Sequence, residues 1–174
     1  MAHDLGDATA IGRGRHGMPP SITIRLLGVA TAAMLGIDAF VHARDAHFYD
    51  AVRTSVISQG TLFRLEAAVA ALVAVALLIR PSRFWWAAAL IVAVSAFGAV
   101  VLYQFVDVGR LGPLPNMFEP TWALPGKSAS AWAEGIGVIL AAAGLLTTRA
   151  RTRGQAGRIS RWTPQTPTSS APGN

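Results

Sequence analysis

The stretch FWWAAALIVAVSAFGAVVLYQFV, residues 84–106, decides the fold because it runs for 23 residues without a charged side chain. A helix that crosses the hydrocarbon layer of a membrane needs about 20 mostly apolar residues, within a range of about 17–25. The stretch is also too long for a strand, is rich in alanine, and lacks the alternation of a membrane β-strand. It therefore predicts a transmembrane helix.

Three further apolar segments have comparable lengths, namely 22–41, 62–79 and 131–147. Each contains charged residues, so each is a weaker prediction by itself. Only 14% of the chain is charged, against roughly 25% for an average soluble domain. The sequence therefore predicts an all-α fold, a membrane-embedded four-helix bundle with these four spans. The alternative, a soluble bundle, is disfavoured because helices that are apolar on all sides normally face lipid.

The positions of arginine and lysine predict the orientation. Ten of these residues fall in the N-terminal segment, the turn at 80–83 and the C-terminal tail, against five in the other two loops. Positive residues collect on the cytoplasmic side, so we expect a plasma-membrane protein with both termini in the cytoplasm. Trp85 and Trp86 are expected at the inner membrane interface, where aromatic rings gather.

The two ends of the chain have polar, glycine-rich or proline-rich compositions that predict disorder in residues 1–20 and 149–174, flanking a transmembrane domain at 21–148. The basic tail could contact anionic lipid headgroups. We expect no nucleic-acid binding, because no folded module accompanies these arginines. Residues 1–43 have an alternative reading as a signal peptide cleaved after Ala43, against which Asp38 argues.

Ionisable side chains recur near the outer ends of the predicted spans. Asp38, Glu66 and Glu134 each lie three or four residues inside a span, Asp107 follows the third span, and His42 lies one helical turn beyond Asp38. Carboxylates within membrane segments are rare and tend to face the bundle interior or water. If Asp38, His42, Glu66 and Glu134 face inward, they form an outward-facing site for a proton or for a divalent metal ion such as zinc.

The same residues also have a structural reading. Ionisable groups near the interface cost little, and the helix dipole favours acids such as Glu66 and Glu134 in a first turn. Asp38 and His42, four residues apart, could simply bond each other, and Arg64 could neutralise Glu66. No other cofactor is expected, because the chain has no cysteine and the second to fourth spans have no histidine to ligate haem.

Small residues at helical spacing predict close packing of the helices, within one chain or between copies. They are Gly28, Ala32 and Gly36 in the first span, Ala67, Ala71 and Ala74 in the second, and Gly137 and Ala141 in the fourth. The outer loop at 106–130 combines four prolines with several large apolar side chains. We expect it to fold back over the outer mouth, either as a lid on the acidic site or as a connector lying on the membrane.

Several short motifs together resemble a group of small uncharacterised four-span integral membrane proteins of high-GC Gram-positive bacteria. They are His42, GTLF at 60–63, LGPLPNMFEPTW at 111–122, and the pair Ala133 and Glu134. The resemblance would cover residues 22–147, and it implies a four-helix membrane fold without a known activity. Four-span DoxX-like proteins share only the number of spans.

The sequence contains no recognisable nucleophile–base pair and no cofactor motif. We therefore expect a non-enzymatic accessory or interaction subunit, surrounded by membrane lipid, in a homo-oligomer or a larger membrane complex. The alternative is a proton- or metal-ion-linked binding protein, sensor or transporter component that uses the outward-facing acidic site.

Overall fold

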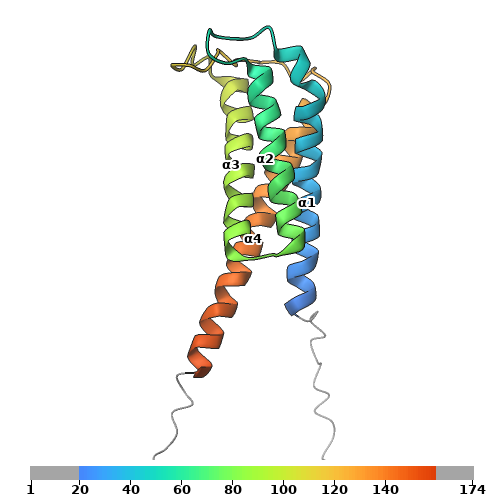
Figure 1. Cartoon of the computed structure of the whole chain (residues 1–174), viewed down its shortest axis with the longest axis vertical. Coiled ribbons are helices and arrows are strands. Elements are labelled where there is room, and N and C mark those ends of the chain that lie inside the picture. The colour runs from blue at the N-terminus through green and yellow to red at the C-terminus, as the bar shows by residue number, and fades with distance from the viewer. Residues whose placement is uncertain (1–19, 160–174) are drawn as a thin grey trace, which may run out of the picture.

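The four predicted spans become four long helices, joined by one short turn and two longer loops. The computed structural model describes residues 20–159. The elements are α1 (Pro20–Asp45), the 3-10 turn η1 (Ala46–Tyr49), α2 (Gln59–Ile79), α3 (Arg83–Phe105) and α4 (Lys127–Ile159). The helices run alternately up and down, so the start of α1 and the end of α4 lie at one end of the bundle (Figure 1). The predicted all-α four-helix bundle is confirmed.

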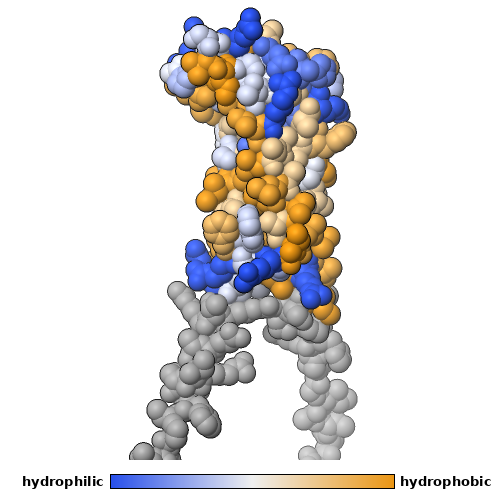
Figure 2. Space-filling view, in the orientation of Figure 1, coloured by the Kyte–Doolittle hydropathy of each residue, from blue (hydrophilic) through white to orange (hydrophobic). Residues whose placement is uncertain are grey.

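We call the end that holds residues 46–58 and 106–126 the loop end, and the opposite end the terminal end. Four helical segments are long and apolar enough to cross a membrane: Ile22–Tyr49, which includes η1, then Gln59–Ile79, Arg83–Phe105 and Lys127–Arg149. Figure 2 shows apolar residues over the middle of the visible face and hydrophilic residues at its two ends. An apolar surface of this extent suits lipid rather than water, which marks the chain as a multi-pass membrane protein.

Trp86, which was expected at the inner membrane interface, is the fourth residue of α3 and its ring packs inside the bundle near the terminal end. Its side chain is fully buried, together with Ala89 and Ala141. A Cβ atom added to Gly144 would overlap the Trp86 ring, so the glycine on α4 provides the room that the indole occupies. Trp86 therefore faces the recess that α4 supplies rather than the surface of the bundle, and its depth at the inner interface stays a prediction.

The small residues pack more selectively than their spacing predicts. Gly137 makes close contact, since an added Cβ would lie 3.6–3.7 Å from side chains of α3 and α1. Gly28 and Gly36 do not, because no atom lies within 4 Å of a Cβ added to either. On α2 the buried face is Ala67, Ala70 and Ala74, and Ala71 points outward instead.

Two helices begin earlier than predicted, and this changes the position of two acidic residues. α2 begins at Gln59, where the Ser58 hydroxyl caps the helix by accepting the Thr61 N–H at 3.0 Å. α4 begins at Lys127. Glu66 and Glu134 are therefore each the eighth residue of their helix, two turns from its start. The prediction that the helix dipole explains these acids is wrong, because its effect is confined to the first turn.

The far end of α4 also differs from the prediction. The helix continues to Ile159, so residues 149–159, which we expected to be disordered, are helical. Residue 20, expected in the N-terminal disordered segment, is the first residue of α1. The remaining parts of the two predicted disordered segments, 1–19 and 160–174, lie outside the described residues.

Candidate ion site and adjoining cavity

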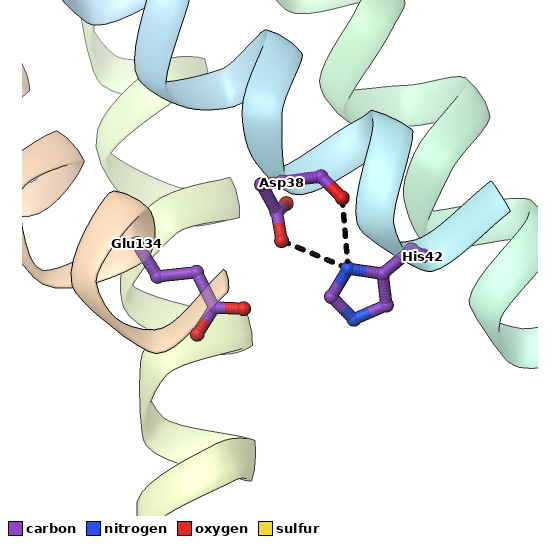
Figure 3. A group of neighbouring side chains, drawn as sticks. All are labelled: Asp38, His42 and Glu134. Carbon is purple, nitrogen blue, oxygen red and sulfur yellow. Dashed lines mark hydrogen bonds and ion pairs between the residues drawn. The ribbon is translucent and has the colours of Figure 1, made fainter. Parts of the chain in front are cut away.

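Asp38 and His42 occupy successive turns of α1 near the loop end, and both are buried. The His42 Nδ1 atom lies 2.8 Å from Asp38 Oδ1 and 3.1 Å from the Asp38 carbonyl oxygen (Figure 3). The bond expected from their four-residue spacing is confirmed. Because Nδ1–H donates to Asp38, a neutral His42 ring keeps its Nε2 lone pair as an acceptor or a metal ligand.

Ser130 and Glu134 bring α4 against this pair. The Ser130 Oγ atom lies 2.8 Å from Asp38 Oδ1 and 2.8 Å from Glu134 Oε1. A hydroxyl group carries one hydrogen, so Ser130 donates to only one of these two oxygens. The second contact is a hydrogen bond only if that carboxyl group supplies the hydrogen. The two carboxyl groups are thus arranged to hold a proton or, in its place, a metal cation.

The second oxygen of each carboxyl group, which does not contact Ser130, has no hydrogen-bond partner among residues 20–159. Asp38 is 1% exposed and Glu134 is 2% exposed. Asp38 Oδ2 and Glu134 Oε2 are buried without a hydrogen-bond partner among residues 20–159. A buried polar group left without a partner costs about 1–3 kcal/mol, and more when it is charged. Both oxygens therefore need positive charge or a donor.

Asp38, His42 and Glu134 can each offer one ligand atom, and these atoms all lie within 4.8 Å of one another. Zinc binds imidazole nitrogen and carboxylate oxygen at about 2.0–2.2 Å, so tetrahedral ligands lie about 3.3–3.6 Å apart. Small side-chain rotations would close the group to that size. These three residues could hold a metal ion.

Glu66, the fourth predicted site residue, lies outside this group of three. Its Oε1 atom is buried without a hydrogen-bond partner in the described part of the chain, and its side chain lines an adjoining cavity together with His42. Arg64, expected near Glu66, pairs instead with Asp50, with both guanidinium–carboxylate contacts at 2.8 Å. This hydrogen bonding by Arg64 lowers the pKa of the exposed Asp50 carboxyl group.

Other acidic residues near the loop end have structural roles. Asp45 accepts hydrogen bonds from Arg44 at 2.6 Å and 3.0 Å. Asp107, predicted beside the site, accepts the Gly109 N–H at 3.0 Å and the Asn116 amide at 2.9 Å. Arg44, like Arg64, is therefore engaged away from Asp38 and Glu134.

The adjoining cavity has a volume of about 440 Å³ and lies between α2 and α3 in the half of the bundle nearer the loop end. Its polar lining includes His42, Glu66, Tyr103 and Ser130. Apolar side chains cover the remainder, including Leu62, Leu65, Val69, Ala96, Ala99 and Val100. The cavity and the group of three share His42, so a molecule in the cavity would lie next to an ion in the site.

The long loop, expected as a lid on the acidic site or as a connector on the membrane, lies against this adjoining cavity. Leu114, Met117 and Leu124 form part of its wall. The loop is tied to the bundle by the Gln104 amide, which donates to the Pro120 carbonyl at 2.5 Å. The Lys127 ammonium group donates to the carbonyls of Glu119 and Thr121. These bonds fix the loop to the last turn of α3 and to the first residue of α4, which flank it in the chain.

Ser130 is the site residue that the sequence interpretation missed. It precedes Glu134 by four residues, the spacing that places two side chains on one helix face. This signal was present, but the predicted helix began only at residue 131. The true start at Lys127 places Ser130 inside α4 and turns it toward α1.

Comparisons of the chain with protein-family models, with curated proteins and with solved structures find no match. The resemblance to four-span proteins of high-GC Gram-positive bacteria therefore stays a prediction. What the chain does has to be argued from the geometry of Asp38, His42, Ser130 and Glu134 and of the cavity beside them.

Proposed function

We propose that this chain is an integral plasma-membrane protein that binds one divalent cation, with zinc as the best match, through Asp38, His42 and Glu134. The observation that carries the proposal is the pair of buried carboxyl groups beside an imidazole, each with an oxygen that lacks a partner among the described residues. With both termini in the cytoplasm, as the arginine distribution predicts, the loop end faces outward. The site then takes its ion from the outer side.

A divalent cation supplies more positive charge than the neighbouring protein groups do. Two buried carboxylates need counter-charge, and a protonated His42 beside Asp38 can supply only one positive charge. The guanidinium groups of Arg44 and Arg64 are engaged by Asp45 and Asp50. One nitrogen and two oxygen ligands suit zinc and leave a fourth position open for water or a substrate atom. Calcium and magnesium prefer all-oxygen sets, so the imidazole argues against them.

The ion would join two helices, because its ligands come from α1 and α4. Ion binding would therefore fix the packing of α1 against α4, which suits a metal-responsive sensor or a transporter component. An accessory or interaction subunit, the function that the sequence favoured, is compatible with this if the ion sets the shape that a partner recognises.

A proton-linked function is the second candidate, and the position of Ser130 supports it. Its Oγ atom lies 2.8 Å from a carboxyl oxygen of both Asp38 and Glu134, and because the hydroxyl group has one hydrogen, a carboxyl proton completes the second bond. In that case the site would exchange a proton with the outer side and would have no selective affinity for metal.

The deciding experiment is zinc titration by calorimetry on the full chain, reconstituted in phosphatidylcholine nanodiscs after treatment with a chelator. We expect one zinc ion per chain, with affinity reduced at least about tenfold by Asp38→Asn or Glu134→Gln. Asp107→Asn is the matched control, because it removes an exposed carboxylate at the same end and should leave affinity unchanged. Absence of zinc binding, or binding that survives both site variants, would reject the metal site and leave the proton site as the candidate.

A further inference from the structure

We propose that the cavity between α2 and α3 binds a lipid-soluble phenol, with its hydroxyl group at Glu66 and His42 and its apolar part between the two helices. This inference goes beyond the ion site. It depends on Glu66 and on the cavity wall, which the group formed by Asp38, His42 and Glu134 does not require.

The size and shape of the cavity suit a small elongated molecule. Its volume of about 440 Å³ falls in the range of about 300–1,000 Å³ that is usual for small-molecule sites. Its wall follows α2 from Gln59 to Val69, which is about 15 Å at a rise of 1.5 Å per residue. The loop covers the end nearest Gln59, so the long dimension points into the membrane region.

The cavity opens toward lipid. Leu65 and Val69 belong to its wall, yet they are 55% and 45% exposed on the outside of the bundle. Ala99 faces them from α3 and is also exposed. Because these apolar wall residues are exposed within the membrane-spanning part of the bundle, the cavity opens into the bilayer. A ligand that enters there must be soluble in lipid.

The polar end of the cavity is rich in hydrogen-bond acceptors. Glu66 Oε1 is buried and lacks a partner among the described residues, and a neutral His42 ring offers its Nε2 lone pair when no metal ion is bound to it. Two acceptors require a ligand that donates. The Lys127 ammonium group in the wall uses two of its three hydrogens on loop carbonyls, and the carboxylates of Asp45 and Glu119 also line the wall, so an anionic headgroup is disfavoured. A hydroxyl group fits this end, whereas a charged amine would first have to cross lipid.

Aromatic side chains surround the same end. Phe63 packs against the His42 ring at a centroid distance of 4.8 Å and against the Tyr49 ring at 4.7 Å. Phe63, Tyr49 and Tyr103 all line the cavity. Such rings favour edge-to-face or offset contacts with another aromatic ring. Together with the acceptors, they select a phenol over an aliphatic alcohol.

The test measures retention of tritiated 4-hexylphenol by the full chain in phosphatidylcholine nanodiscs, relative to nanodiscs without protein. We expect saturable binding of one molecule per chain. Hexylbenzene, which lacks only the hydroxyl group, should compete about three- to tenfold less well, and Glu66→Leu should weaken phenol binding by a similar factor, as expected for one hydrogen bond. Ala99→Trp should abolish binding by filling the cavity.

The matched control is Val101→Trp, which adds the same ring to an exposed position of α3 outside the cavity wall and should leave binding intact. Equal competition by hexylbenzene would overturn the proposal, because the cavity would then accept only apolar chains. Tighter binding of hexylamine, or full binding by the Ala99→Trp variant, would also overturn it.

One further variant distinguishes the proposed ion site from the proposed phenol site. Asp38→Asn should remove zinc binding while phenol binding persists in the presence of a chelator. If the natural protein binds phenol but no zinc, the proposed ion site is rejected, and if it binds zinc but no phenol, the cavity assignment is rejected.

Discussion

Asp38 on α1 and Glu134 on α4 meet through a single hydroxyl group, since the Ser130 Oγ atom lies 2.8 Å from a carboxyl oxygen of each. All three side chains are buried at the loop end of the bundle. Their contacts join the first and last helices of the bundle.

Ser130→Ala should destabilise the metal-free protein by about 1–2 kcal/mol, because it leaves Glu134 Oε1 without its buried hydrogen-bond partner, whereas Asp38 Oδ1 keeps His42. Guanidinium or urea unfolding in detergent, followed by tryptophan fluorescence, would measure the change. Ser95→Ala is the control, since the Ser95 hydroxyl donates only to the Val92 carbonyl on its own helix at 2.9 Å. Equal losses in the two variants would mean that the Ser130 bridge contributes nothing special.

The double variant Asp38→Asn with Glu134→Gln should separate stability from ion binding. Without metal it should unfold at an unchanged or higher denaturant concentration, because replacing buried charged groups is often neutral or stabilising. Zinc at about 100 times the dissociation constant should stabilise the natural protein by about 2.7 kcal/mol and should not stabilise the variant. A zinc-dependent shift of the same size in both proteins would place the ion elsewhere.

Gly144→Ala should destabilise the bundle by about 1–3 kcal/mol, because the added methyl group meets the buried Trp86 ring and forces it to move. Gly28→Ala is the matched control, since no atom lies within 4 Å of its added Cβ. Because alanine loses less conformational entropy than glycine when a helix forms, that variant should be as stable as the natural protein or more stable. Thermal unfolding of both variants in one detergent checks the contrast, and a tolerated Gly144→Ala would contradict the packing of α3 against α4.

The exposed pair Asp50 and Arg64 gives a prediction outside the ion site. Hydrogen bonding by Arg64 lowers the pKa of Asp50, so Arg64→Gln should raise that pKa toward its ordinary value. A lowered carboxyl pKa stabilises the fold above the unfolded-state pKa, and this contribution disappears as the pH falls through the folded-state pKa. NMR titration of the Asp50 carboxyl carbon measures the change, and added salt should reduce it. An unchanged titration curve would mean that the pair does not form in solution.

The fold was predictable because the length and composition of the helices reflect the membrane directly. One stretch, 84–106, was sufficient for a span, and four such spans leave little choice of architecture. The pairing of Asp38 with His42 was also predictable, since residues four apart on a helix are neighbours. The approach of Glu134 to them followed only as a hypothesis, because it depends on the rotation of α4 against α1.

The remaining differences come from contacts between distant parts of the chain. Trp86 is buried because Gly144, on another helix, leaves room for its ring. Glu66 faces a cavity because α2 and α3 separate beside it, and nothing on α2 alone encodes that separation. Ser130 escaped notice because the small polar residues before residue 131 belong to the helix, which starts directly after the turn at Gly126.

Where α1 meets α4, a buried hydrogen bond between Ser130 and Asp38 joins the two helices near the loop end. Along the chain, these helices are the farthest apart, and in space they close the ring of four. The hydrogen bond from Ser130 to Asp38 therefore joins the first and last helices without a covalent link, so the two ends of the membrane domain are held together by side chains alone.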